Sequence, residues 1–137
     1  MKKDIILAGV GGQGILTIAT IIGDAATAAG LNLKQAEVHG MSQRGGDVQS
    51  NLRLSTELIH SDLIKQGATD LIISMEPMEA LRYIPYINKE AWVITSSHPF
   101  KNIPNYPEEE ALMKELENLP HVAALPIEDV AKENNLP

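Results

Sequence analysis

Short apolar runs alternate with segments of helical periodicity along the first part of the chain. Ile5–Val10 is a continuous apolar run, which predicts a strand buried on both faces. Ile15–Ala29 is rich in alanine, isoleucine and threonine, and Gly30 follows it where a helix commonly ends. Leu33–Val38 predicts a weaker second strand, because three of its positions are polar.

Residues 48–60 show a different pattern, in which apolar and polar side chains alternate. The alternation over Val48–Ser55 predicts a strand with one buried face. Leu58–His60 is expected to pair with it as a β-hairpin that turns at Thr56 and Glu57. This inserted hairpin interrupts the regular succession of strands and helices.

The second half of the chain returns to the succession of strands and helices. Its pattern predicts strands at Asp70–Ser74, Ala91–Thr95 and Val122–Leu125, and helices at Pro77–Ile87, Pro107–Leu119 and Ile127–Asn134. Together these elements predict an α/β, Rossmann-like fold: a mainly parallel sheet with flanking helices and an inserted β-hairpin. The 137 residues suit one domain, 1–137. Because the chain stops one short helix after a strand, we expect it to be truncated at its C-terminus.

Composition and charge argue against two classes of partner, nucleic acids and membranes. The chain is 44% hydrophobic and carries a formal net charge of −7, with eight acidic residues and two lysines in residues 105–137. An acidic chain without a basic cluster repels phosphate backbones, so no nucleic-acid partner is expected. The N-terminus superficially resembles a signal peptide or membrane span, but Asp4 and four glycines from Gly9 to Gly14 interrupt it. We therefore expect a cytoplasmic protein with no membrane partner.

The chain contains no cysteine, which limits the chemistry that it can perform unaided. Disulfides, thiolate nucleophiles and cysteine-ligated zinc or iron–sulfur centres are excluded. No metal site is expected either, since no second histidine or carboxylate lies at ligand spacing near His39. Glu79 and Arg82 have the spacing of an ion pair on the surface of a helix.

A glycine-rich segment, GVGGQG, joins the first predicted strand to the first predicted helix. Gly9, Gly11 and Gly14 match the G-x-G-x-x-G pattern in the structural context that this pattern requires. We expect Gly9 to permit a tight turn, Gly11 and Gly12 to leave backbone N–H groups open to an anion, and Gly14 to let the helix approach the strand. Two interpretations stay open: a cradle for phosphate or nucleotide, or a turn needed only for packing.

A dinucleotide-binding fold also needs an acidic residue about 20 residues after the glycines, at the end of the second strand. Glu37 lies 23 residues after Gly14. The match is partial, because the second strand of such folds is strongly apolar whereas this one reads LKQAEV.

A second polar, glycine-rich segment, EVHGMSQRGG, spans residues 37–46. Its arginine, histidine and neutral hydrogen-bonding side chains are suited to bind an anionic or polar group, and arginine makes bidentate contacts with carboxylate or phosphate. The alternative is that Arg44 pairs with Glu37 or lies in solvent, while Gly45 and Gly46 turn the chain into the next strand.

These segments together resemble a known family. GVGGQGI, EVHGMSQRGGDV, the following NLRLS strand and MEPMEALRYIPYI resemble the beta subunit of indolepyruvate:ferredoxin oxidoreductase, a gamma-type domain of the 2-oxoacid:acceptor oxidoreductases. The resemblance covers most of residues 4–99, and the wording HGMSQRGG points to the indolepyruvate branch. It implies a single gamma-type domain over residues 1–137 and a chain that normally continues past Pro137.

The resemblance implies an accessory subunit. The reaction it implies is oxidative decarboxylation of indolepyruvate or another arylpyruvate to the acyl-CoA, with coenzyme A as co-substrate and electrons passed to ferredoxin. Thiamine diphosphate, magnesium and the iron–sulfur clusters are expected in a larger partner subunit. The candidate cofactor-binding residues of this chain are Gly9, Gly11, Gly12, Gln13, Gly14, His39, Ser42, Arg44, Gly45 and Gly46. No catalytic residue is assigned. A free-standing dinucleotide-binding oxidoreductase and a nucleotide-sensing module remain as alternatives.

Overall fold

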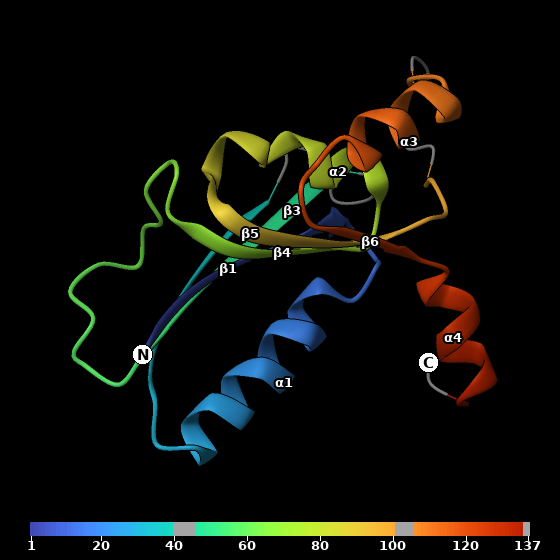
Figure 1. Ribbon diagram of the computed structural model, residues 1–137. Coiled ribbons are helices and arrows are strands. Elements are labelled where there is room, and N and C mark those ends of the chain that lie inside the picture. Colours follow the sequence, from blue (N-terminus) through green and yellow to red (C-terminus); the bar gives the residue numbers. More distant parts are fainter. Residues whose placement is uncertain (40–45, 101–105, 136–137) are drawn as a thin grey trace.

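The computed structural model describes residues 1–39, 46–100 and 106–135, and shows a central sheet with helices on both faces (Figure 1). The strands are β1 (Lys2–Val10), β2 (Asn32–His39), β3 (Asp47–Ser55), β4 (Thr69–Ser74), β5 (Ile87–Ser96) and β6 (Val122–Leu125). The helices are α1 (Ile15–Ala28), α2 (Pro77–Arg82), α3 (Glu109–Glu117), α4 (Ile127–Glu133) and the short 3₁₀ helix η1 (Ile84–Tyr86).

The described strands form one mixed, mainly parallel sheet in the order β2-β3-β1-β4-β5-β6. The pairs β1–β4, β4–β5 and β5–β6 are parallel, whereas β3 is antiparallel to both β1 and β2. Helical crossovers place α2 and α3 between successive parallel strands, as expected of parallel pairs. The predicted α/β, Rossmann-like class is confirmed.

The predicted hairpin is wrong in its second strand. The strand at 48–55 forms as β3, but its hairpin partner is β2, and Leu58–His60 lies in an irregular loop between β3 and β4. Both edges of β3 are already occupied, since Leu52 pairs with Ile5 on one side and with Gln35 on the other. No edge therefore remains for a third strand.

The helix predicted over Pro77–Ile87 is shorter than expected. It ends at Arg82, η1 follows, and Ile87 begins β5. Pro85 explains the break, because proline lacks the N–H needed for an α-helical hydrogen bond and restricts the residue before it. The remaining predicted elements form with shifts of a few residues at their ends.

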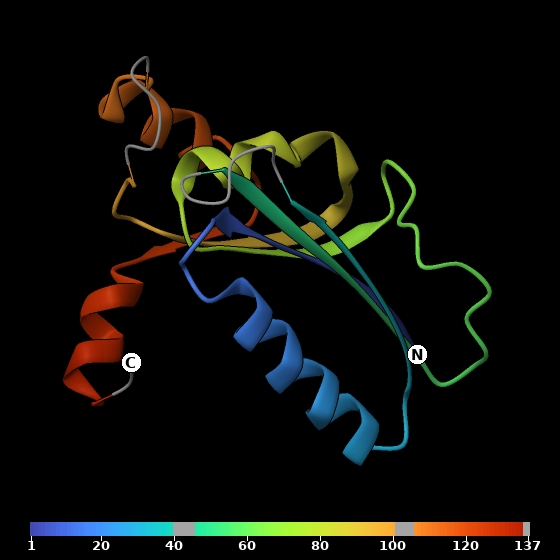
Figure 2. The ribbon, with the colours of Figure 1, turned by 180° about the vertical axis from the view of Figure 1, so that it is seen from behind.

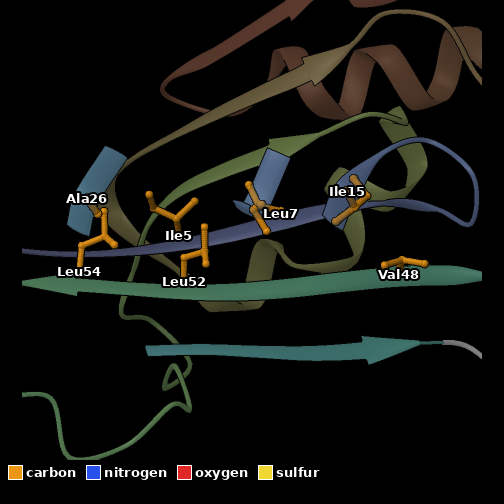
Figure 3. Packing of buried hydrophobic residues seen from close by; sticks show 8 residues of the cluster. Ile5, Leu7, Ile15, Ala26, Val48, Leu52 and Leu54 are labelled. Carbon is orange, nitrogen blue, oxygen red and sulfur yellow. The ribbon is translucent and has the colours of Figure 1, made fainter. Parts of the chain in front are cut away.

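The sheet separates two apolar layers. Figures 1 and 2 show α1 and α4 on one side of the sheet and α2, η1 and α3 on the other. Under α1, Ile15 and Ala26 pack toward side chains of β1 and β3, among them Leu7 and Leu52 (Figure 3). On the opposite face, a second cluster around Ile6 and other buried residues packs beneath α2 and α3. Burial on both faces explains why β1 reads as a continuous apolar run.

Candidate functional site at the carboxyl edge of the sheet

The two glycine segments meet at one edge of the sheet. β1 ends there and the antiparallel β3 begins there, so that Val10 lies opposite Asp47. The backbone N–H of Gly11 donates a hydrogen bond to the carbonyl of Gly46 over 2.9 Å. In α/β sheets, ligands commonly bind outside the carboxyl ends of the parallel strands. The edge formed by these two segments is therefore the candidate site, and we call it the carboxyl edge.

The structure corrects two of the roles expected of the glycines in the first segment. The Gly11 N–H is not open to an anion, because it donates to the Gly46 carbonyl. A Cβ atom at Gly9 would lie 2.8 Å from Ile15 Cδ1 and 2.9 Å from Gln13 Oε1, so it is Gly9 that permits close packing. Gly12 and Gly14 have φ angles of 95° and 82°, in the left-handed region that favours glycine, and added Cβ atoms there would meet nothing within 4 Å. The expectation that Gly14 permits close packing is wrong, because the space beside it is open.

Gln13 braces the glycine segment against the neighbouring strand. Its Oε1 accepts a hydrogen bond from the Val10 N–H at 2.9 Å, and its Nε2 donates to the Met75 carbonyl at 3.2 Å. Both ends of the amide therefore bind the protein's own backbone. In this arrangement Gln13 holds the loop in position.

The N-terminus of α1 opens onto the same edge. Gly14 is the N-cap residue, and no side chain among the described residues caps the helix there. The first turn of α1 contains no acidic residue. Unpaired N–H groups and the positive end of the helix dipole favour an anion at such a position.

The second glycine segment is described only at its two ends. Ser42, Arg44 and Gly45 lie in residues 40–45, outside the described residues, and they stay predictions. His39 ends β2, and Gly46 is placed beside Gly11 by the hydrogen bond given above.

Glu76 is a central residue of this edge that sequence reasoning missed. Its side chain is fully buried and caps the N-terminus of α2, where its Oε1 accepts from the N–H groups of Met78 and Glu79. Its Oε2 accepts from the Phe100 N–H at 2.9 Å and from the Tyr106 hydroxyl at 2.5 Å. One carboxylate thus links α2 to chain segments that precede α3.

Burial near Glu76 raises the pKa values of two neighbouring groups, Tyr106 and Glu79. Burial raises the pKa of the Tyr106 hydroxyl, and the hydrogen bond to Glu76 raises it further. Burial raises the pKa of the Glu79 carboxyl from its ordinary value of 4.5 to about 7, although Arg82 opposes the shift. Asp47, at the start of β3, adds a smaller repulsive contribution to the pKa of Glu79.

The predicted ion pair between Glu79 and Arg82 forms, with Nε and Oε2 2.7 Å apart. It is not a surface pair, however, because the Glu79 side chain is buried and only Arg82 is exposed. Residue 79 turns inward because α2 lies flat on the sheet, with Ala80 also completely buried. Helical spacing alone could not distinguish the two faces of so short a helix.

The described residues contain no group of three or more histidine and carboxylate side chains placed to bind a metal. Within the same ranges, none of the helices combines the length and the apolar character that crossing a membrane requires. The full sequence has no cysteine. Its donor atoms therefore do not fit a cysteine-ligated iron–sulfur cluster.

Curated relatives share much of this sequence. The chain is 40% identical to indolepyruvate oxidoreductase subunit IorB of Archaeoglobus fulgidus, over 96% of this chain and 68% of that protein. It is 46% identical to subunit IorB of Thermococcus kodakarensis, over 72% of this chain and 49% of that protein. The chain thus spans about two thirds of one relative and about half of the other.

Solved structures share the fold at low sequence identity. A 2-oxoglutarate:ferredoxin oxidoreductase from Magnetococcus marinus matches 98% of this chain and 22% of its own, with a TM-score of 0.70 and 18% identity. The pyruvate oxidoreductase subunit PORC of Thermotoga maritima matches 96% of this chain and 66% of its own, with a TM-score of 0.69 and 13% identity. The family model for pyruvate ferredoxin/flavodoxin oxidoreductase matches residues 4–137, and the chain belongs to that family.

Proposed function

We propose that this chain is the accessory, gamma-type subunit of a thiamine-diphosphate-dependent 2-oxoacid:ferredoxin oxidoreductase. Its substrate is indolepyruvate or another arylpyruvate, which the complex converts to the acyl-CoA while it reduces ferredoxin. Residues 1–137 form one gamma-type domain of a longer natural chain. The proposal places the complex in the cytoplasm.

The observation that carries the proposal is the agreement of four relatives on one name. Relatives called indolepyruvate oxidoreductase subunit IorB are 40–46% identical to this chain. Relatives called 2-oxoglutarate synthase subunit KorC are only 31–33% identical, over a shorter stretch. The higher identity favours an aryl 2-oxoacid as the substrate class over 2-oxoglutarate.

The donor atoms of the chain support a division of labour with a larger subunit. Because residues 1–137 contain no cysteine, this domain supplies no thiolate ligand for an iron–sulfur cluster, and we place the clusters in the companion. Thiamine diphosphate supplies the carbon chemistry when it is bound, and we place it with its magnesium in the companion as well. This chain contributes a rigid surface, and the companion contributes the redox centres and the contact with ferredoxin.

The carboxyl edge is the surface that we expect to face the companion's active site or the coenzyme A that enters it. The open space beside Gly12 and Gly14 leaves the backbone accessible, and the N-terminus of α1 favours negative charge there. We propose that the guanidinium of Arg44, in the second glycine segment, donates to the same anionic group. These groups bind and orient an anionic substrate group, and they perform no covalent step.

A free-standing dinucleotide-binding oxidoreductase is less well supported by the geometry. Glu37 lies on β2, and β3 separates β2 from β1, so the acidic residue is two strands away from the glycine segment. Adjacent strands are about 4.8 Å apart, which places Glu37 roughly 10 Å to the side. Calorimetric titration with NADH distinguishes an accessory subunit from a dinucleotide-binding oxidoreductase, because the accessory-subunit proposal predicts no heat of binding at millimolar NADH. A nucleotide-sensing module would bind nucleotide, but its presence would not raise the activity of any oxidoreductase partner.

The proposal is tested by co-expression of this chain, in full-length form, with the larger catalytic subunit of the same organism. The purified complex is expected to contain iron and thiamine diphosphate and to reduce ferredoxin with indolepyruvate and coenzyme A. The chain purified alone is expected to contain no iron and to show no decarboxylation. Turnover by the chain alone, or a complex inactive with every arylpyruvate, would contradict the proposal.

A further inference from the structure

A hollow of about 480 Å³ opens at the end of the sheet where β1 begins and β3 ends. Its walls come from these two strand ends and from the irregular loop of residues 56–68. Figures 1 and 2 show this loop, in green, beside the start of β1. A strand rises about 3.3 Å per residue, so the nine residues of β1 separate the hollow from the carboxyl edge by roughly 25 Å. We call it the amino-edge hollow.

Four cationic side chains gather at the amino-edge hollow. Lys2, Arg53 and Lys65 line it. Lys34 lies on the same face of the sheet as Arg53, because the two residues pair directly in the register of β2 and β3. The sequence shows no basic cluster, since these four residues belong to β1, β2, β3 and a loop. Folding brings them together at one end of a chain whose net charge is −7.

The positive charge at this end exceeds what the buried carboxylate of Asp4 requires. Lys2 Nζ lies 2.9 Å from Asp4 Oδ2, and Arg53 Nε lies 3.0 Å from Asp4 Oδ1, so two cations already balance this carboxylate. Lys34 and Lys65 form no ion pair with any carboxylate of the described residues. Like charges placed directly opposite each other destabilise a sheet, so the pairing of Lys34 with Arg53 opposes folding. The two unpaired lysines are therefore available to an anion.

Arg53 is held in one orientation at the wall of the hollow. Its Nη1 donates to the carbonyls of Ser61 and Leu63 at 2.8 and 3.3 Å, in addition to the contact of Nε with Asp4. Nη2 has no hydrogen-bond partner in the part of the chain that the structure describes. The side chain is only 18% exposed. A guanidinium that is already fixed loses little conformational entropy when a free N–H group binds an anion.

The size and the walls of the hollow suit a small molecule with a doubly charged group. Its volume lies within the range of about 300–1,000 Å³ that is typical of small-molecule sites. Two unpaired lysines and the free Nη2 of Arg53 match a dianion, and a phosphate monoester carries a charge of about −1.5 to −2 at pH 7. Leu58 and Ile59 add an apolar wall against which an organic group can pack.

We propose that the amino-edge hollow binds a phosphate group, either as inorganic phosphate or as the phosphate monoester of a small organic molecule. Arg53 Nη2 and the ammonium groups of Lys34 and Lys65 hold the phosphate oxygens. No covalent step takes place. Because the hollow lies at the opposite end of the sheet from the carboxyl edge, its ligand is distinct from the group that the carboxyl edge is proposed to bind, and the site does not depend on the proposed function.

NMR titration of the full-length chain, labelled with nitrogen-15, tests the site directly. Inorganic phosphate is expected to shift the Nε–H signal of Arg53 and the amide signals of residues 56–68 with a dissociation constant below about 10 mM, at constant ionic strength. AMP and adenosine are titrated beside it. Tighter binding of AMP than of phosphate, with no binding of adenosine, would identify a monoester as the ligand. Equal binding of AMP and phosphate would identify inorganic phosphate.

Three variants make the test specific. Lys34→Ala and Lys65→Ala each remove a cation that has no partner, and each is expected to raise the dissociation constant of phosphate about 5- to 10-fold. Lys132→Ala, on the exposed surface of α4, is the matched control and is expected to leave it within about twofold. Dispersed amide signals check that the variants remain folded. Arg53 itself is not replaced, because it also holds the loop.

Three results would overturn the proposal. One is the absence of any shift at the amino-edge hollow with about 10 mM phosphate or AMP. Another is unchanged affinity in both Lys34→Ala and Lys65→Ala. The third is an equal loss in Lys132→Ala, which would show that phosphate responds only to the overall charge of the chain. The activity of the assembled complex enters none of these measurements, so they leave the proposed enzymatic role to its own test.

Discussion

At the scale of single residues, the buried Glu79 makes folding stability depend on pH. Its folded-state pKa of about 7 lies above its ordinary value of 4.5, so the neutral acid is the form that the folded state favours. The corresponding stability is fully present below about pH 4.5 and is lost as the pH rises to about 7. For Glu79→Gln, we expect the stability relative to wild type to increase between pH 4.5 and 8 by up to about 3 kcal/mol.

Urea unfolding at both pH values measures this difference. Glu110→Gln, on the exposed surface of α3, is the matched control and should change the pH dependence by less than about 0.5 kcal/mol. The contrary outcome would be the same change in unfolding free energy for the wild type and Glu79→Gln between pH 4.5 and 8. That result would mean that the Glu79 carboxyl keeps its ordinary pKa, and that burial does not raise it.

Gly9 provides a second prediction at this scale. Gly9→Ala adds a Cβ atom 2.8 Å from Ile15 Cδ1, and such overpacking typically costs about 1–3 kcal/mol. Ile15→Val removes that Cδ1 atom, so Gly9→Ala should cost less in the Ile15→Val background than in the wild type. A double-mutant cycle measured by thermal unfolding gives the coupling energy. Independent, additive effects of the two substitutions would contradict the predicted contact.

At the scale of secondary-structure elements, Gln13 joins the loop after β1 to the end of β4. Gln13→Ala removes both hydrogen bonds, to the Val10 N–H and to the Met75 carbonyl, and leaves these backbone groups without their partner. We expect a loss of about 1–3 kcal/mol in unfolding free energy. Amide hydrogen exchange should accelerate at Val10, whereas Gln66→Ala, in the exposed loop before β4, should leave it unchanged. Unchanged exchange in Gln13→Ala would show that the brace is not needed.

The same scale shows what the sequence could predict of the fold. Strands and helices were predictable because apolar runs and helical spacing are local signals. The strands that pair with β3 could not be predicted in the same way. Periodicity shows which face of a strand is exposed, but it does not show which strand lies along each edge. The break of α2 had a local signal in Pro85, which forbids the continuation of an α-helix.

Of the candidate site, the positions of the glycines could be predicted from the sequence, whereas the burial of two glutamates could not. GVGGQG lies between β1 and α1 as expected, because glycine spacing is tied to the backbone itself. Glu76 and Glu79 have the sequence pattern of exposed helix residues, and only tertiary packing buries them. One signal was available: Pro77 is suited to the first position of a helix, which makes Glu76 the N-cap residue.

At the scale of the whole molecule, the carboxyl edge is the surface for which a partner is predicted. The carboxyl edge combines open backbone, a helix N-terminus and the second glycine segment, which suits polar or anionic groups.

The role proposed for the carboxyl edge can be tested by replacing Arg44 in the assembled complex. Under the proposed function, Arg44 contacts an anionic group in the assembled complex, and a charge-assisted hydrogen bond contributes about 1.5–3 kcal/mol. Arg44→Ala is therefore expected to lower kcat/KM of the complex roughly 10- to 100-fold. Thermal unfolding of the chain should be unchanged, and the companion should still co-purify with it.

Lys114→Ala, on the exposed surface of α3, is the control for the loss of a positive charge and should retain full activity. The three measurements separate the possible roles of Arg44, because a ligand contact lowers activity without affecting folding or assembly. Loss of co-purification would instead assign the residue to the subunit interface. Full activity of Arg44→Ala would mean that Arg44 contacts no anionic group in the complex, and the anion-binding interpretation of the second glycine segment would then be wrong.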